Sequence, residues 1–400
     1  MTTSFAHRPD EATLTAFQQQ LDAIRDEALA RRGQKDADYI RNMIRFQRGC
    51  EISARMLLVL GFVPPFSNVW WLLWGAGVLL LSLAKILDNM EIGHNVMHGQ
   101  YDWMNDPHIN SRHFNWDIAA DSDSWKRYHN HEHHTYTNII GKDRDFGYGL
   151  LRLSDDIPWR PKNLYQFFTY LNLSLLFQWG VAYHELAAER IFFGKRRKDS
   201  HLPIPREQLR KDFFSKINKQ VFKDYLFFPL LALPFGLLAG AGLAIAGWVV
   251  LGNLIANLVR NLWTSTIIFC GHFTEQVHTF DEKDCQNESR GQWYYRQILG
   301  SSNLEGKRWF HILTGHLSCQ IEHHLFPDVP ARHYVWMAPQ VQQLCQQYGI
   351  PYNTGSFGHQ YLTVVKRVLR YSLPDKKSKP TDSLAAGDTS PADEGSQLLQ

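Results

Sequence analysis

Residues 56–84 read MLLVLGFVPPFSNVWWLLWGAGVLLLSLA, an uncharged run that the turn-forming residues 64–68 (PPFSN) divide near its middle. A second apolar run covers residues 225–259 and carries three glycines close to its centre. A helix needs about 20 residues to span a membrane, and a single span has no need of a turn halfway along. Each run is therefore predicted to form a hairpin of two membrane-spanning helices, which gives four spans.

The first hairpin is short for two spans, so we expect its first helix to begin near Cys50 and to include the charged residues Glu51 and Arg55. The alternatives are one long span in each run, or a pair of buried core helices in a soluble protein. Residues 164–186 are apolar but interrupted by polar side chains, which favours a helix on the membrane surface over a fifth span. The prediction is an all-α integral membrane protein with four transmembrane helices in two hairpins.

The distribution of basic residues predicts the orientation. Four arginines lie at residues 41–55, and the basic run 195–198 (KRRK) separates the two hairpins, whereas neither hairpin tip carries a charge. Because cytoplasmic loops are enriched in Lys and Arg, we expect both termini and the middle segment on the cytoplasmic side of the inner membrane. The first 35 residues show no cleavable secretory signal.

Composition excludes several classes of protein. The chain has 400 residues with 42 basic and 39 acidic side chains, and its net charge of +3 excludes nucleic-acid binding through the charge of the whole chain. Its five cysteines are scattered and form no CxxC pair, so a disulfide framework, a zinc ribbon or an iron–sulfur cluster is not expected. The 19 histidines, by contrast, are concentrated in three short segments.

These three histidine clusters lie beyond the ends of the predicted spans. They are residues 94–98 (HNVMH), residues 129–138 (HNHEHHTYTN) and residues 316–327 (HLSCQIEHHLFP). Residues four apart on a helix share a face, so each HxxxH pair can hold one ion, and an adjacent HH pair can serve two neighbouring ions. The second hairpin carries the chain out and back, which returns the third cluster to the side of the first two.

Two further positions join the candidates. On a continuous helix, His316 and Gln320 would share a face with the HH pair at residues 323–324. His272 follows the last predicted span, whose polar stripe indicates a face turned toward the protein interior. Eight or nine imidazoles exceed what one zinc ion or a mononuclear facial triad requires, and they suit two first-row transition-metal ions with open positions for oxygen.

Nine other histidines are not expected to bind metal. They have no histidine partners at helical spacing, or they fall outside the register of the clusters: His7, His108, His113, His131, His184, His201, His278, His333 and His359.

In chain order, the clusters supply the patterns HxxxH (His94, His98), HxxxHH (His129, His133, His134) and QxxHH (Gln320, His323, His324). These patterns resemble the three histidine boxes of the membrane fatty acid desaturase family. The flanking phrases HNVMHGQYDWMNDP (94–107), HHTYTN (133–138) and QIEHHLFPDVP (320–330) are similar to its bacterial acyl desaturase branch. The resemblance extends from roughly residue 40 to residue 370.

The resemblance implies a di-iron site beneath a cytosolic helical cap on four transmembrane helices. Carried over residue by residue, the implied ligands are His94, His98, His129, His133, His134, His272, His323 and His324, and the spacing described above adds His316 as the ninth. In stearoyl-CoA desaturases the third box begins with His, where this chain has Gln320. We expect His316 to supply the missing ligand, and Gln320 is the alternative.

With this cap, the chain divides into six segments. They are a cytosolic helical segment (1–48), hairpin 1 (49–88), a cap segment with boxes 1 and 2 and the interfacial helix (89–222), hairpin 2 (223–271), a cap segment with box 3 (272–373) and a disordered tail (374–400).

The family resemblance also implies the reaction. Fatty acyl methylenes have no acidic proton and no leaving group, so the expected chemistry is O2 activation by two iron ions (Fe2+/Fe3+) and removal of hydrogen from adjacent carbons, with no catalytic side chains apart from the metal ligands. The product would be a cis double bond in a saturated acyl chain carried on CoA or on a membrane lipid. The branch that the chain resembles implies the delta-9 position for this bond. A membrane di-iron hydroxylase of lipids or alkanes is the alternative. A metal transporter is disfavoured because its ligands would lie inside the spans.

Electrons must come from another protein. The chain has no GxGxxG after a strand, no ferredoxin cysteine pattern and no haem-binding His-Pro-Gly-Gly. We therefore expect electrons from NAD(P)H to arrive through a separate ferredoxin- or flavin-type reductase and carrier. The basic run 195–198 is expected to be a solvated loop, with a contact to an acidic donor or to lipid as the alternative.

Overall fold

The computed structural model describes residues 8–185, 192 and 205–374. The basic run 195–198, nearly all of the expected tail, His7 and His201 lie outside the described residues. The described part is mostly helical, and one small parallel sheet pairs β1 (Asn303–Glu305) with β2 (Thr354–Ser356).

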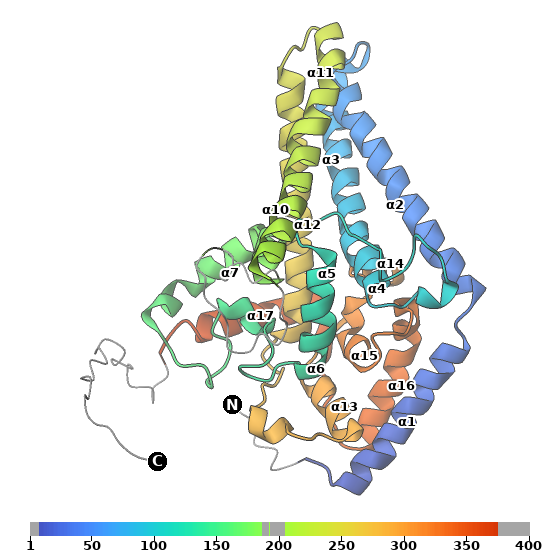
Figure 1. Cartoon of the computed structure of the whole chain (residues 1–400), viewed down its shortest axis with the longest axis vertical. Coiled ribbons are helices and arrows are strands. Elements are labelled where there is room, and N and C mark those ends of the chain that lie inside the picture. The colour runs from blue at the N-terminus through green and yellow to red at the C-terminus, as the bar shows by residue number, and fades with distance from the viewer. Residues whose placement is uncertain (1–7, 186–191, 193–204, 375–400) are drawn as a thin grey trace, which may run out of the picture.

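Both apolar runs fold into helical hairpins, which together form the tall column in Figure 1. The first hairpin joins α2 (Gln34–Leu60) to α3 (Trp70–Leu87) through the short 3-10 turn η2 (Phe66–Val69). Gly61 is required at this tip because a Cβ there would meet the backbone oxygen of Trp70 at 2.8 Å.

The second hairpin consists of two long helical stretches joined by a glycine-containing turn. The first consists of α10 (Arg206–Phe222), the π-helical segment η8 (Lys223–Phe227) and α11 (Phe228–Leu238), which follow one another without a break. Gly240 and Gly242 then adopt positive φ angles of 73° and 55°, and α12 (Ala244–His272) runs back toward the base. α12 packs against both α11 and α3, so the two hairpins form one bundle.

Among the described residues, three helical stretches are long and apolar enough to cross a membrane: Phe66–Met97, Arg206–Leu238 and Ala244–His272. α2 is not among them, because charged side chains recur along most of its length. The last two of these, Glu51 and Arg55, lie close to its apolar C-terminal end. Several expected segment boundaries, at 48/49, 88/89 and 222/223, fall inside continuous helices.

Residues 164–186 do not form one helix. After the turn η7 (Pro161–Tyr165), the described part forms α7 (Gln166–Leu175) and α8 (Phe177–Glu185), which are separated at Leu176. The expectation of a single helix over residues 164–186 is therefore wrong, and neither helix, as far as the structure describes it, has the roughly 20 residues that a span needs.

The base of the column is built from short helices and turns (Figure 1). They are α1 (Glu11–Ala30), η3 (Asp88–His94), α4 (Asn95–Met97), η4 (Asp102–Met104), α5 (Ser122–Trp125), η5 (Lys126–His133), α6 (His134–Tyr136), η6 (Phe146–Gly149), η9 (Glu282–Cys285), α13 (Arg290–Leu299), α14 (Arg308–Leu313), η10 (Leu317–Cys319), α15 (Gln320–Leu325), η11 (Ala331–His333), α16 (Tyr334–Gln347) and α17 (Phe357–Arg370).

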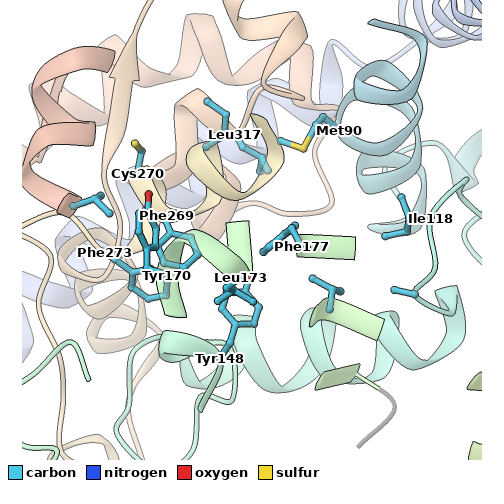
Figure 2. Packing of buried hydrophobic residues seen from close by; sticks show 14 of the residues in the cluster. Met90, Ile118, Tyr148, Tyr170, Leu173, Phe177, Phe269, Cys270, Phe273 and Leu317 are labelled. Carbon is cyan, nitrogen blue, oxygen red and sulfur yellow. The ribbon is translucent and has the colours of Figure 1, made fainter. Parts of the chain in front are cut away.

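An aromatic core fixes the lower end of α12. Figure 2 shows Phe269 of α12 and Phe273, which directly follows α12, among Tyr148, Tyr170 and other buried side chains. The Phe269 ring lies 4.9 Å from that of Phe273 and 5.1 Å from that of Tyr170. Burying one such ring contributes about 1.5–3 kcal/mol, so this core holds the end of α12, and with it His272, in a defined place.

Candidate metal centre

The first two histidine clusters lie on π-helical turns. His94 ends η3, which continues α3, and both His129 and His133 lie in η5. π-Helical turns are rare and occur frequently at functional sites. The rings within each HxxxH pair are close, with centroids 4.6 Å apart for the first pair and 5.0 Å for the second. The prediction that each pair shares a face is confirmed, although the turns are wider than the expected α-helix.

The third cluster departs from the expected continuous helix. His316 has a left-handed φ of 58°, residues 317–319 form a 3-10 turn, and α15 begins only at Gln320. Nδ1 of His316 lies 2.9 Å from Glu91 Oε2, and His316 is absent from the groups of converging ligand atoms among the described residues. Nε2 of Gln320 instead lies 2.9 Å from Nε2 of His272. The shared helical face expected for His316 is wrong because the left-handed residue breaks the helix.

The structure brings together the other eight predicted histidines, which we call the histidine centre: His94, His98, His129, His133, His134, His272, His323 and His324. Their ligand atoms form sets in which all members lie within 4.8 Å of one another: His94, His98, His129 and His323; His133, His272 and His324; and His134, His323 and His324. Because the sets share members and adjoin, the arrangement offers two neighbouring sites.

Eight ring nitrogens of these histidines are buried and have no hydrogen-bond partner. They are Nε2 of His94, His98 and His129, both ring nitrogens of His134 and His323, and Nδ1 of His272. A buried polar atom without a partner costs about 1–3 kcal/mol, so such atoms call for a ligand. Nε2 of His272 lies 3.4 Å from that of His133 and 3.1 Å from that of His324, close to the spacing of about 3.0–3.4 Å for two nitrogens about 2.1 Å from one ion. The donor set therefore fits transition-metal ions.

Outer partners orient several of these rings. Nδ1 of His133 lies 3.0 Å from Asp143 Oδ1, and Nδ1 of His129 lies 3.2 Å from Asp145 Oδ2. Nδ1 of His324 lies 2.9 Å from the amide oxygen of Gln297. Each contact favours a proton on Nδ1 and leaves the Nε2 lone pair for the centre.

Sequence reasoning missed these partners. Asp143 and Asp145 follow the second box closely, in the pattern Asp-Arg-Asp. Carboxylates so close to a histidine cluster could have been predicted as hydrogen-bond partners of its rings. Gln297 lies on α13 and is 27 residues from its histidine, so no local pattern reveals it.

Burial and neighbouring charges set the protonation of the centre. Burial lowers the pKa of His134 and of His323 well below the usual value, and neighbouring imidazoles lower it further. Burial also lowers the pKa of His133, but the nearby Asp143 carboxylate outweighs burial and the net shift is upward. Burial raises the pKa of Asp145, yet hydrogen bonds from His129 and His184 hold it well below its ordinary value. Burial therefore favours the neutral form of His134 and His323, whereas the outer carboxylate of Asp145 is ionised.

A cavity adjoins the histidine centre. Candidate ligand residues that line it are His94, His129, His133, His272 and Gln320. Its wall also includes the polar residues Asn89, Asp145, Gln178, Arg260, Asn261 and Thr264 and the apolar residues Met90, Trp116, Ile118, Trp125, Tyr148, Phe177, Val181, Ile268, Phe273 and Leu317, several of which appear in Figure 2. A pocket with many apolar side chains and a few polar groups is typical of a site for a largely apolar ligand.

The histidines that were not expected to bind metal remain outside the centre where the structure describes them. His108, His113, His131 and His359 are exposed, and Nε2 of His333 lies 2.9 Å from Asp36 Oδ1. His184 also lies outside the centre, but it contacts Asp145.

Comparison with known proteins agrees with this geometry. A family profile described as fatty acid desaturase matches residues 68–356, a region that contains the whole histidine centre. The chain is 41% identical over 372 residues to the NADPH-dependent stearoyl-CoA 9-desaturase of Mycobacterium tuberculosis, a match that covers 93% of this chain and 83% of that protein. It is 24% identical over 297 residues to the sn-1 linoleoyl-lipid 6-desaturase of Synechocystis, covering 69% of this chain and 74% of that protein.

Proposed function

Since this chain belongs to the fatty acid desaturase family, we propose that it uses O2 to introduce a cis double bond at the delta-9 position of a saturated acyl chain carried on CoA. The observation that carries this proposal is the convergence of eight histidines, six of them buried, beside a largely apolar cavity. The CoA thioester and the bond position rest on the 41% identity to a stearoyl-CoA 9-desaturase, whereas the lipid-acting relative is only 24% identical.

The histidine centre would hold two iron ions, since clustered imidazoles suit iron among the first-row metals. The unpartnered buried nitrogens support this assignment. When bound, the iron pair supplies O2 activation and abstraction of hydrogen atoms from two adjacent methylenes, which no side chain in the cavity can perform. In this proposal Gln320, which contacts His272, is the ninth polar group at the iron site. His316 contacts Glu91 and is not a ligand.

The chain's own residues hold the substrate. Phe177, Val181 and Ile268 line the apolar part of the cavity and position the acyl chain beside the centre. Asp143 and Asp145 keep the box-2 rings in one orientation. The protein thereby fixes which carbons face the metals and excludes water from them.

The proposed membrane topology has four spans, with α2 as the fourth. α2 packs along α3, and Ala54 and Leu58 lie in the same buried cluster as Val78 and Leu81. Arg55, the charge nearest its apolar end, turns inward to Asn253 and Asp224, as charges inside a membrane bundle do. The histidine centre and the short helices would then form a cap on the cytoplasmic side of the inner membrane.

The apolar surface of α7 supports an interfacial position for that helix. Phe168 of α7, and Leu164 and Tyr165 of the preceding turn η7, are exposed although they are large and apolar. Such a patch suits the boundary between headgroups and acyl chains. It would seat the cap on the membrane, next to a source of lipid substrate or product.

Electrons would reach the iron pair from NADPH through a separate reductase and carrier. The relative in Mycobacterium tuberculosis is named as NADPH-dependent. This chain shows no dinucleotide-binding GxGxxG after a strand, so the pyridine nucleotide would bind to the reductase.

The test is an analysis of cellular fatty acids by gas chromatography–mass spectrometry. A host that lacks the activity would express the chain with a matched reductase pair, either as the wild type, as His323→Ala or as the exposed-residue control His113→Ala. A delta-9 monounsaturated acid in the wild type and the control, but not in His323→Ala, supports the proposal. No new double bond, in a host shown to supply electrons and iron, overturns it, and hydroxylated lipid in the same extracts would indicate a hydroxylase instead.

A further inference from the structure

α8 forms one wall of the cavity and also contacts the histidine centre indirectly. Phe177, Gln178 and Val181 line the cavity, and His184 follows on the same helix. Residues 177, 181 and 184 are spaced i, i+4 and i+7, so they share one face of α8. His184 is buried, with 6% of its surface exposed, and its Nε2 lies 3.2 Å from Asp145 Oδ1.

Asp145 stands between His184 and a proposed metal ligand. Its Oδ2 lies 3.2 Å from Nδ1 of His129, so its two oxygens accept from imidazoles on opposite sides. Its backbone N–H donates to Asp143 Oδ1 at 2.9 Å, and Asp143 also binds His133. This short network reaches both HxxxH histidines of box 2.

The geometry makes the carboxylate orientation depend on both imidazoles. With a donor at each oxygen, the Asp145 carboxylate has one favourable orientation, and the His129 ring is held with Nε2 toward the centre. Without the donor at Oδ1, the carboxylate can rotate and the ring of His129 can follow.

We propose that His184 is a positioning residue that ties the cavity wall α8 to the metal ligand His129 through Asp145. Contact of an acyl chain with Phe177 and Val181 therefore changes the geometry of the metal centre. The inference rests on the proposed function for its substrate, but its metal-binding part stands on the contacts alone.

Two substitutions separate hydrogen bonding from packing. His184→Gln keeps an N–H donor near the position of Nε2, whereas His184→Phe keeps a ring without a donor. His113→Gln and His113→Phe, at an exposed histidine, are the matched controls. The full-length enzyme in lipid nanodiscs would be stripped of iron and titrated with Co2+, which reports ligand geometry through its visible absorption.

We expect His184→Phe to weaken binding of one of the two Co2+ ions by about tenfold, the low end of the 10–100-fold range for loss of an outer partner. His184→Gln should bind as the wild type does. Addition of stearoyl-CoA should shift the Co2+ spectrum of the wild type and of His184→Gln, and leave that of His184→Phe unchanged. In the iron-loaded enzyme, His184→Phe should also form fewer double bonds per O2 consumed.

Wild-type Co2+ affinity and a wild-type spectral response in His184→Phe would overturn the proposal. Equal impairment in His184→Gln and His184→Phe would also overturn it, because packing alone would then explain the result. If thermal unfolding shows that His184→Phe does not fold, His184→Met serves as the donor-free variant. A Co2+ defect in His184→Phe together with a wild type that desaturates no acyl substrate would refute the proposed function and leave the positioning link standing.

Discussion

Two groups of buried or partly buried polar side chains lie beside α12, and they differ in whether their polar atoms have partners. In the histidine centre, eight buried ring nitrogens have no hydrogen-bond partner. The charge cluster, which we define as Arg55, Lys85, Asp117, Lys223 and Asp224, lies between the long helices, and every member has an ion-pair partner. Nζ of Lys85, for example, lies 2.9 Å from Asp224 Oδ2 and 3.6 Å from Asp117 Oδ2.

This difference separates a binding site from a structural site. Removing one member of a satisfied cluster leaves an uncompensated buried charge, so folding suffers. Removing one member of an unsatisfied cluster takes away an atom that was costly to bury, so folding suffers little and ligand binding is lost. The two regions should therefore respond in opposite ways to substitution.

The largest effect should follow His323→Ala, which removes a nitrogen donor shared by two of the converging sets. We expect activity to fall by more than about 100-fold, beyond the loss typical for an outer partner of a ligand, because no neighbouring side chain can take its place. Product formation by gas chromatography–mass spectrometry measures the change. The metal-free variant should unfold at the temperature of the metal-free wild type or above it, and an active variant would refute the assignment of the site.

In the charge cluster, Asp224→Asn should cost about 3–5 kcal/mol of unfolding free energy, because Lys85, Lys223 and Arg55 would lose a shared carboxylate. Thermal or denaturant unfolding in lipid nanodiscs measures it. Iron content per folded protein should stay at the wild-type level. A variant that folds normally but loses iron would contradict the assignment of the charge cluster as a structural site.

Metal removal should destabilise the protein through the histidine centre. Chelation of iron should lower the unfolding free energy by about 3 kcal/mol relative to protein at a free metal concentration of about 100 times Kd. Calorimetry with and without chelator measures the difference. The same treatment of His323→Ala should have a smaller effect, and an equal effect in both would place the bound metal elsewhere.

The smallest effect is expected at a third buried site, Asp36. Like the members of the charge cluster, its carboxylate has partners. Burial raises the pKa of Asp36, but hydrogen bonds from His333 and from the Gly33 N–H outweigh burial and hold the pKa below its usual 3.8. The folded state therefore gains stability that is complete above pH 3.8 and disappears as pH falls through the lower, folded-state pKa.

Asp36→Asn should lower the unfolding free energy by about 1–2 kcal/mol at pH 7, and the difference from wild type should shrink under more acidic conditions. Unfolding curves recorded from pH 7 down to pH 3 measure it. A constant difference at every pH would show that the carboxylate charge contributes nothing.

Much of the metal site was predictable from local spacing. The HxxxH pairs and the HH pairs place imidazoles on common faces whatever the rest of the fold does, and all eight histidines of the centre were named from the sequence. His316 was misplaced because the pattern assumed one helix from residue 316 to residue 324. The left-handed backbone at His316 interrupts that helix, and no side-chain periodicity reports it.

The fold shows the same division. Apolar runs interrupted by Pro64 and by glycines near residue 240 predicted two helical hairpins, because turn chemistry is local. The break at Leu176 and the π-helical turns that carry His94 and His129 were not foreseen. These features arise where a helix must adjust to neighbours that are distant in the chain.

The sequence by itself determined which side chains could act together: hairpins from apolar length, shared faces from helical spacing, and a metal-binding donor set from the density of histidines. Only the tertiary structure decided which nitrogens remain without partners, that Gln320 rather than His316 adjoins His272, and that His184 reaches Asp145. The physical reason is range. Periodicity records contacts within a few residues, whereas the hydrogen bond from residue 184 to residue 145 and the one from residue 316 to residue 91 form only after the chain has packed.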